Sequence, residues 1–149
     1  MGFSRPTDIQ YRSIQHILDG EDVMAVAPTG TGKTAAFVIP IINHIVKNKR
    51  RGEGIRSLIL VPTRELAKQI AEVVDLIGIK TGVSCLGLYG GVSQDDQIKV
   101  LERRLDVLVA TPGRMFDLIS QGYIKLENIE FFVIDEADLM LDLGFNKDI

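Results

Sequence analysis

A glycine-rich stretch at residues 27–34, APTGTGKT, contains the residue types that bind a polyphosphate. Gly30 and Gly32 allow the backbone to turn so that successive N–H groups point at phosphate oxygens, and a helix beginning near Lys33 adds its positive dipole end. The lysine would reach the β- and γ-phosphates, and the Thr34 hydroxyl would bind Mg²⁺. Ala27 stands where the usual phosphate-binding pattern begins with glycine. Taken alone, the stretch also fits a glycine-rich turn with a surface lysine.

Two adjacent acids, Asp135 and Glu136, follow the apolar run at residues 131–134. Ligands of open α/β sheets bind at the carboxyl ends of the strands, so these acids are expected where the glycine-rich stretch also lies. Asp135 is suited to hold Mg²⁺, usually through water, and Glu136 to orient or deprotonate a water that attacks a γ-phosphate. An acidic pair by itself also fits the start of a helix, which its dipole favours.

The elements that would position these residues follow from short apolar runs that alternate with helical patterns. Strands are predicted at residues 23–27, 58–61, 83–88, 107–110 and 131–134. Helices are predicted at residues 7–18, 33–46, 64–77 and 114–120. The strands lack polar alternation, which favours a parallel sheet covered on both faces. The sequence therefore predicts an α/β fold with a mainly parallel central sheet.

The composition limits the classes of protein that the chain can represent. Its 149 residues are 46% hydrophobic, which fits one globular domain, and the net charge of -3 argues against binding nucleic acid through bulk positive charge. A single cysteine, Cys85, excludes a disulfide within the chain and is expected to be a buried bystander. The longest apolar stretch, residues 35–42, is too short to cross a membrane, so we expect a soluble protein of the cytoplasm or nucleus. The charged residues 47–54 are most simply a solvated loop.

Residues 135–138 read Asp-Glu-Ala-Asp, the tetrapeptide after which the DEAD-box RNA helicases are named, and further segments resemble motifs of that family in order and spacing. These segments are Gly2-Phe3 with residues 6–10 (the Q motif), residues 62–67 (motif Ia), Gly90-Gly91 (the double glycine) and residues 111–114 (motif Ib). The resemblance covers essentially the whole chain. It implies a three-layer RecA-like domain of the P-loop NTPase class, with ATP and Mg²⁺ as cofactors.

The resemblance also implies a set of nucleotide-binding residues. Gln10 would read adenine, and a carboxamide can donate to and accept from adenine N7 and N6. The implied nucleotide contacts are Arg5, Gln10, Thr29, Gly30, Thr31, Gly32, Lys33, Thr34 and Asp138. Asp138 would couple nucleotide to RNA rather than bind metal. The implied catalytic residues are Lys33, Asp135 and Glu136, and the implied metal ligands are Thr34 and Asp135.

A second implied set binds the sugar-phosphate backbone of one RNA strand. Most of these residues stand where a strand gives way to a helix, so that free N–H groups and hydroxyls meet phosphates while an arginine adds bidentate reach. The set consists of Pro62, Thr63, Arg64, Gly90, Gly91, Thr111, Pro112, Gly113 and Arg114. Such a local site needs few positive charges, so a protein with a net negative charge can still bind RNA.

The resemblance further implies that residues 1–149 are the first helicase domain, incomplete at its C-terminus. The family's next strand would lie between the strands at residues 23–27 and 131–134, and a second RecA-like domain would supply an arginine finger. Accessory proteins are further possible partners. We therefore expect residues 1–149 alone to be nearly inactive and to be unstable or to associate.

Three other classes of protein share parts of this pattern. A GTPase would need Asn-Lys-x-Asp, but residues 146–149, NKDI, place the acid one position early, and Gln10 favours adenine. A DNA helicase would use the same ATP chemistry. A scaffold that binds nucleotide without hydrolysing it would have no chemical need for Lys33, Thr34, Asp135 and Glu136 together.

Overall fold

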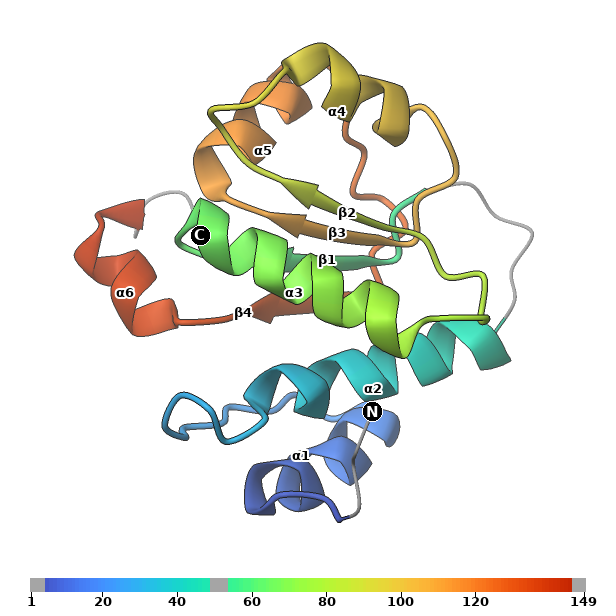
Figure 1. Ribbon diagram of the computed structural model, residues 1–149, viewed down its shortest axis with the longest axis vertical. Coiled ribbons are helices and arrows are strands. Elements are labelled where there is room, and N and C mark those ends of the chain that lie inside the picture. Colours follow the sequence, from blue (N-terminus) through green and yellow to red (C-terminus); the bar gives the residue numbers. More distant parts are fainter. Residues whose placement is uncertain (1–4, 49–53, 146–149) are drawn as a thin grey trace. The chain divides into compact units, whose positions relative to one another are not determined.

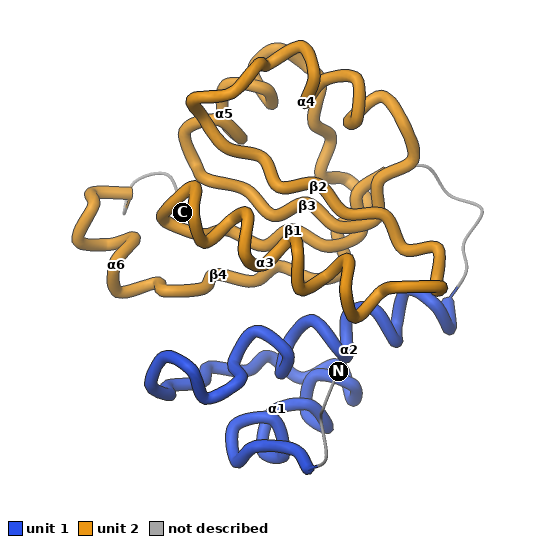
Figure 2. The backbone as a smooth tube through the Cα atoms, in the orientation of Figure 1, with its two compact units in different colours: residues 1–49 blue, residues 50–149 orange. Residues whose placement is uncertain are grey.

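The computed structural model describes residues 5–48 and 54–145, and the chain forms two compact units, Met1–Lys49 and Arg50–Ile149 (Figure 2). The predicted Gly2-Phe3 part of the Q motif and the tail at residues 146–149 lie outside the described residues, as does most of the predicted loop at 47–54. No helix in the described part of the chain is long and apolar enough to span a bilayer.

The first unit contains two helices that pack on each other, α1 (Asp8–Leu18) and α2 (Lys33–Lys47) (Figure 1). Thr7 precedes α1 in extended backbone, and its N–H donates to the side-chain oxygen of Gln10 over 3.1 Å, which closes the first turn. Both helices were predicted from their apolar periodicity and are confirmed to within one residue at each end.

The strand predicted at residues 23–27 is wrong. These residues form no strand, and Met24 and Val26 are 94% and 89% exposed. A strand requires a neighbour for its backbone N–H and C=O groups, and among the described residues no strand pairs with this run. The residue types at 23–27 do favour a strand, but residue type alone does not form a strand that has no partner to pair with.

The second unit is built on four parallel strands: β1 (Ser57–Leu60), β2 (Cys85–Leu88), β3 (Val107–Ala110) and β4 (Phe131–Ile134). Their order in the sheet is β2-β3-β1-β4, so β1 and β3 are central and fully buried (Figure 1). The four helices of this unit are α3 (Arg64–Ile77), α4 (Gln94–Leu101), α5 (Pro112–Ser120) and α6 (Ala137–Asp142). The predicted α/β fold with a parallel sheet is confirmed.

Helices cover both faces of this sheet. On one face, Leu58 and Leu108 belong to the same buried cluster as Leu118 of α5. Side chains alternate between faces along a strand. On the other face, a Cβ atom added at Gly87 would lie 3.3 Å from the Cβ of Ala71 on α3, so this glycine lets α3 approach β2 closely. The second unit is therefore layered as helix, sheet and helix.

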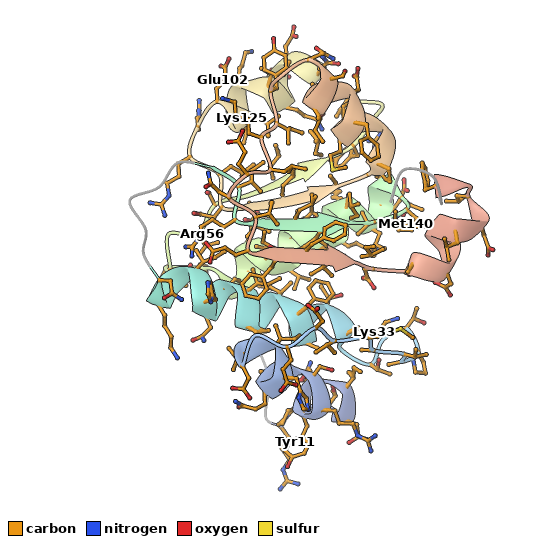
Figure 3. The ribbon with its side chains drawn as sticks, turned by 180° about the vertical axis from the view of Figure 1, so that it is seen from behind. Tyr11, Lys33, Arg56, Glu102, Lys125 and Met140 are labelled. Carbon is orange, nitrogen blue, oxygen red and sulfur yellow. The ribbon has the colours of Figure 1, made fainter. Side chains whose placement is uncertain are left out.

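A buried ion pair joins the starts of β1 and β4. Arg56 donates from Nε to Oε1 of Glu130 over 2.7 Å and from Nη2 to Oε2 over 3.1 Å (Figure 3). The two side chains are only 8% and 22% exposed. The pair is bidentate and lies at the amino ends of the strands, opposite the carboxyl edge where the predicted site residues lie. The Arg56–Glu130 pair thus holds β1 and β4 in place relative to each other, and predicted site residues follow both strands.

Candidate functional site

The glycine-rich stretch forms a tight loop before α2. Gly30 and Gly32 have φ angles of +80° and +87°, which L side chains rarely adopt. The hydroxyl of Thr31 donates to the carbonyl of Pro28 over 2.6 Å and closes the loop. Lys33, the first residue of α2, is half-buried (Figure 3). This is the backbone that the sequence predicted for a phosphate-binding loop at a helix N-terminus.

Gln10 is buried beside this loop, with 3% of its surface exposed. Its Oε1 accepts from the N–H of Thr7, and its Nε2 donates to the carbonyl of Gly32 over 3.2 Å. A Cβ atom at Gly32 would lie 2.5 Å from this Nε2. A carboxamide has two N–H groups and two acceptor lone pairs, so one of each remains for a base. The contact with Gly32 was not predicted, because the two residues are far apart in sequence.

The remaining predicted nucleotide contacts of the first unit lie in the loop itself, in the first turn of α2 and in the segment before α1. Thr29 and Gly30 are exposed, and Thr34 is half-buried in the first turn of α2. Arg5 is exposed in the segment before α1. The first unit thus carries both the phosphate loop and the residue predicted to read the base.

The acidic pair occupies a sharp turn between β4 and α6. The N–H of Asp135 donates to the carbonyl of Leu60 over 3.0 Å, which extends the pairing of β4 with β1 by one residue. Oδ1 of Asp135 accepts from the N–H of Glu136, also over 3.0 Å. Glu136 has a φ of +53°, a left-handed conformation that costs a non-glycine residue on the order of 1 kcal/mol or more. The strained residue is the one predicted to orient the attacking water.

The short helix α6 holds this turn in place. The N–H of Met140 donates to the carbonyl of Glu136 over 3.0 Å, and the Met140 side chain is fully buried in the core of the unit (Figure 3). Asp135 and Glu136 are half-buried, whereas Asp138 is exposed. Among the described residues, no group of three or more His, Cys, Asp or Glu side chains could hold a metal ion. The predicted metal ligands, the Thr34 hydroxyl and the Asp135 carboxylate, are hard oxygen donors of the kind that Mg²⁺ prefers, and they belong to different units.

The residues predicted to bind RNA lie in the segments that follow β1, β2 and β3, at the same carboxyl edge as the acids. The hydroxyl of Thr63 accepts from the N–H of Leu66 over 3.2 Å and caps α3. Thr111 stands before α5 in extended backbone, and its side chain does not cap the helix. Pro62 and Pro112 are buried and shape these turns, whereas Gly113 is exposed.

Both predicted arginines converge on one loop, residues 89–92, which contains Gly90 and Gly91. The guanidinium of Arg64 lies 5.3 Å from the centre of the Tyr89 ring, and its Nη1 is 3.5 Å from the carbonyl oxygen of Gly91. Arg114 donates from Nη1 to Oε1 of Gln97 over 3.0 Å, and its Nη2 is 3.5 Å from the carbonyl oxygen of Val92. The structure therefore brings together two residues that are fifty positions apart.

Two residues of this cluster, Tyr89 and Gln97, were missed from the sequence. Gln97 is buried on α4, a helix that was itself not predicted, and its Nε2 donates to the carbonyl of Tyr89 over 3.2 Å. The helix had a local signal, since Ser93 is an N-cap residue followed by two acids, Asp95 and Asp96.

The chain is similar to known proteins along nearly its whole length. The profile of the DEAD/DEAH box helicase family matches residues 7–149. The chain is 49% identical over 147 residues to the ATP-dependent RNA helicase DBP3 of Lodderomyces elongisporus, covering 99% of this chain and 27% of that protein. It is 45% identical to the DEAD-box ATP-dependent RNA helicase 5 of Oryza sativa subsp. japonica, covering 99% of this chain and 30% of that protein.

A solved structure is similar along the same length. The crystal structure of a hypothetical ATP-dependent RNA helicase from Sulfolobus tokodaii superposes with a TM-score of 0.89 at 41% identity, over 99% of this chain and 42% of the other. The chain thus spans about a quarter to a third of the length of these curated relatives.

Proposed function

Because this chain belongs to the DEAD/DEAH box helicase family, we propose that it is the nucleotide-binding first domain of an ATP-dependent RNA helicase. It binds Mg-ATP and the backbone of one RNA strand. In the whole protein, hydrolysis of ATP is coupled to unwinding of RNA duplexes or to remodelling of RNA–protein complexes. Relatives named ATP-dependent RNA helicases support this function.

One observation carries the proposal within the second unit. The acids Asp135 and Glu136 follow β4, the arginines Arg64 and Arg114 follow β1 and β3, and these three strands are neighbours in one parallel sheet. Parallel strands have their carboxyl ends at one edge, so hydrolytic acids and phosphate-binding cations share a rigid support.

The residues divide the chemistry of hydrolysis among them. Backbone N–H groups of the loop and the Lys33 ammonium bind the phosphates, and Glu136 orients or deprotonates the attacking water. When bound, Mg²⁺ would be held by the Thr34 hydroxyl and the Asp135 carboxylate and would neutralise charge on the phosphates.

Adenine is assigned to Gln10. After its bonds to Thr7 and Gly32, the carboxamide keeps one N–H and one lone pair, which match the N7 acceptor and the N6 donor of adenine. Because the Gln10 side chain also bonds to Gly32, binding of the base would affect the conformation of the predicted phosphate loop.

The whole protein is proposed to contain a second RecA-like domain. That domain would supply an arginine finger, which raises the rate of hydrolysis by roughly 10³ to 10⁵. It would also supply the remaining part of the RNA-binding surface. Accessory proteins would bind the protein that contains both domains. The share of the relatives that this chain covers supports this organisation. In the described part of the chain β4 is at the edge of the sheet, where a further strand could pair with it.

The proposal is tested by the ATPase activity of the full-length protein with RNA or DNA oligonucleotides of the same sequence. RNA is expected to stimulate turnover and DNA to have little effect. Equal stimulation by DNA would reassign the protein to DNA. Turnover that neither nucleic acid changes would favour a nucleotide-binding protein without helicase activity.

A further inference from the structure

Gln97 of α4 is one of the few polar side chains that the second unit buries, with 6% of its surface exposed. Its Nε2 donates to the carbonyl of Tyr89 over 3.2 Å, and its Oε1 accepts from Nη1 of Arg114 over 3.0 Å. Burial of a carboxamide is costly unless its donor and acceptor are both bonded. Both ends of Gln97 are bonded, and the side chain bridges a backbone loop to an arginine.

The bond from Gln97 restricts Arg114 without using up its donors. A guanidinium presents five N–H groups in one rigid plane, and Nη1 gives one of them to Gln97. The approach of Nη2 to the carbonyl of Val92 is long, at 3.5 Å, and therefore weak. One firm contact thus fixes the plane of Arg114, while Nε and Nη2 remain available to bind a phosphate bidentately.

The same glutamine supports the loop that carries the second arginine. Tyr89, whose carbonyl Gln97 holds, places its ring beneath the guanidinium of Arg64. That ring packs beside Gly87, where an added Cβ atom would lie 3.4 Å from its Cε1. The carbonyl of Gly91, in the same loop, is 3.5 Å from Nη1 of Arg64. Gln97 therefore contacts Arg114 directly and is linked to Arg64 through the backbone of Tyr89.

We propose that Gln97 is a positioning residue for RNA binding, which holds Arg114 and the 89–92 loop in the conformation that receives the sugar-phosphate backbone. It does not touch RNA itself. The affinity for RNA increases because an arginine that is already ordered loses less side-chain entropy when phosphate binds. This inference rests on the proposed binding of RNA by Arg114.

The test uses the full-length protein with Gln97→Met, which keeps the length and apolar volume of the side chain but removes both hydrogen bonds. The matched control is Gln94→Met on the same helix, since Gln94 bonds only to the side chain of Gln121. Affinity for a single-stranded RNA oligomer is measured over a range of salt concentrations, for Gln97→Met, Arg114→Ala and the double variant. Thermal unfolding and Mg-ATP affinity are measured on each.

We expect Gln97→Met to weaken RNA binding roughly threefold to tenfold, the cost of ordering one or two long side chains. In the double variant, the loss should be smaller than the sum of the two single losses, because part of the effect of Gln97 acts through that arginine. The RNA concentration that half-stimulates the ATPase should rise, whereas turnover at saturating RNA should stay near wild type. Gln94→Met should match the wild type throughout.

Other outcomes overturn the inference. If Gln97→Met binds RNA like Gln94→Met, or if its effect adds fully to that of Arg114→Ala, Gln97 does not position Arg114. Parallel losses in Mg-ATP affinity and in turnover at saturating RNA would mean a general structural role. If Gln97→Met does not fold, Gln97→Asn, one methylene too short to reach both partners, is measured instead and judged by the same criteria. Failure of the wild type to bind RNA would instead remove the proposed function.

Discussion

The side-chain amide of Gln10 donates to the carbonyl oxygen of Gly32 over 3.2 Å, so α1 is tied to the last turn of the loop that precedes α2. The same carbonyl also accepts the first hydrogen bond of α2, from the N–H of Ala36 over 3.2 Å. The carbonyl oxygen of Gly32 thus links Gln10, the residue predicted to read the base, to the N-terminus of α2, which follows the predicted phosphate-binding loop. This junction leaves no room for a side chain at position 32.

Gly32→Ala is expected to lower the affinity for Mg-ATP by roughly tenfold or more, because a Cβ atom there meets Nε2 of Gln10 at 2.5 Å in addition to straining a φ of +87°. The matched control is Gly30→Ala, where φ is +80° but no atom lies within 4 Å of the added Cβ. That variant should lose less. Calorimetry with Mg-ATP compares the two, and equal losses would show that backbone strain alone accounts for the effect.

Lys33→Ala is expected to weaken Mg-ATP binding while leaving the unfolding temperature unchanged, since it removes the charge that faces the β- and γ-phosphates. Lys47→Ala, at the exposed last residue of the same helix, removes an equal charge away from the loop and should bind as the wild type does. The measurement is again calorimetric. An unchanged affinity of Lys33→Ala would remove this lysine from the phosphate site.

Glu136→Gln, made in the full-length protein, is expected to keep nucleotide affinity but to lower ATP hydrolysis by roughly 10² to 10⁴-fold, the usual contribution of a positioned acid or base. The two side chains have nearly the same shape, so the left-handed turn at this position should persist. Steady-state ATPase assays with saturating RNA measure the change, with Glu127→Gln, at an exposed site, as the control. Turnover near the wild-type rate would assign the water-orienting role to another residue.

Arg64→Ala and Arg114→Ala are each expected to weaken RNA binding about equally for all sequences. Each should also lower the magnitude of the slope of log K against log salt concentration by about 0.7, the value for one phosphate contact on a single strand. Contacts to the sugar-phosphate backbone read no bases. The exposed Arg103 provides the control for loss of one positive charge. A loss confined to some members of a panel of RNA oligomers would contradict the assignment to the backbone.

Cys85 is expected to react slowly with iodoacetamide in the native protein. Burial, together with the nearby charge of Asp75, raises the pKa of the Cys85 thiol well above its ordinary value, so little thiolate is present near neutral pH. Alkylation at pH 8 should accelerate greatly in a urea concentration that unfolds the chain. Similar rates in both conditions would mean that the thiol is accessible and that its role as a buried bystander is wrong.

Strong local signals made most of the fold predictable from the sequence. Thr63 caps α3, and the apolar face of that helix repeats at helical spacing, so both of its ends were predicted correctly. The strands β3 and β4 were also predicted to the residue, because each is a short run of apolar, mostly β-branched or aromatic residues. The short helices α4 and α6 were missed, since neither is long enough to establish a period.

Tertiary contacts account for what the sequence could not reveal about the site. The residue types of the glycine-rich loop and of both arginines were predicted from motifs. The arginines lie in the predicted strand-to-helix segments, whereas the loop precedes its predicted helix but follows no strand. Nothing local indicates that Gln97 is buried or that it joins Tyr89 to Arg114, because those partners are brought to it only by the order of the strands. The unpaired run at residues 23–27 has the same explanation, since a strand depends on a neighbour that its own sequence does not specify.

The strand order β2-β3-β1-β4 also has a consequence for folding kinetics. Strand β1 is made first, yet Ser57 pairs with Val107 and Phe131 and not with any residue of β2. During synthesis, this fully buried strand therefore has no partner until some fifty further residues have been made, and its second ladder forms later still. Such non-local pairing slows folding and lengthens the time for which an apolar strand is exposed. The helix α3 cannot relieve this exposure early, because it packs mainly on β2 and β3, which are made later. The ribosome-bound stage is therefore where aggregation competes most strongly with folding.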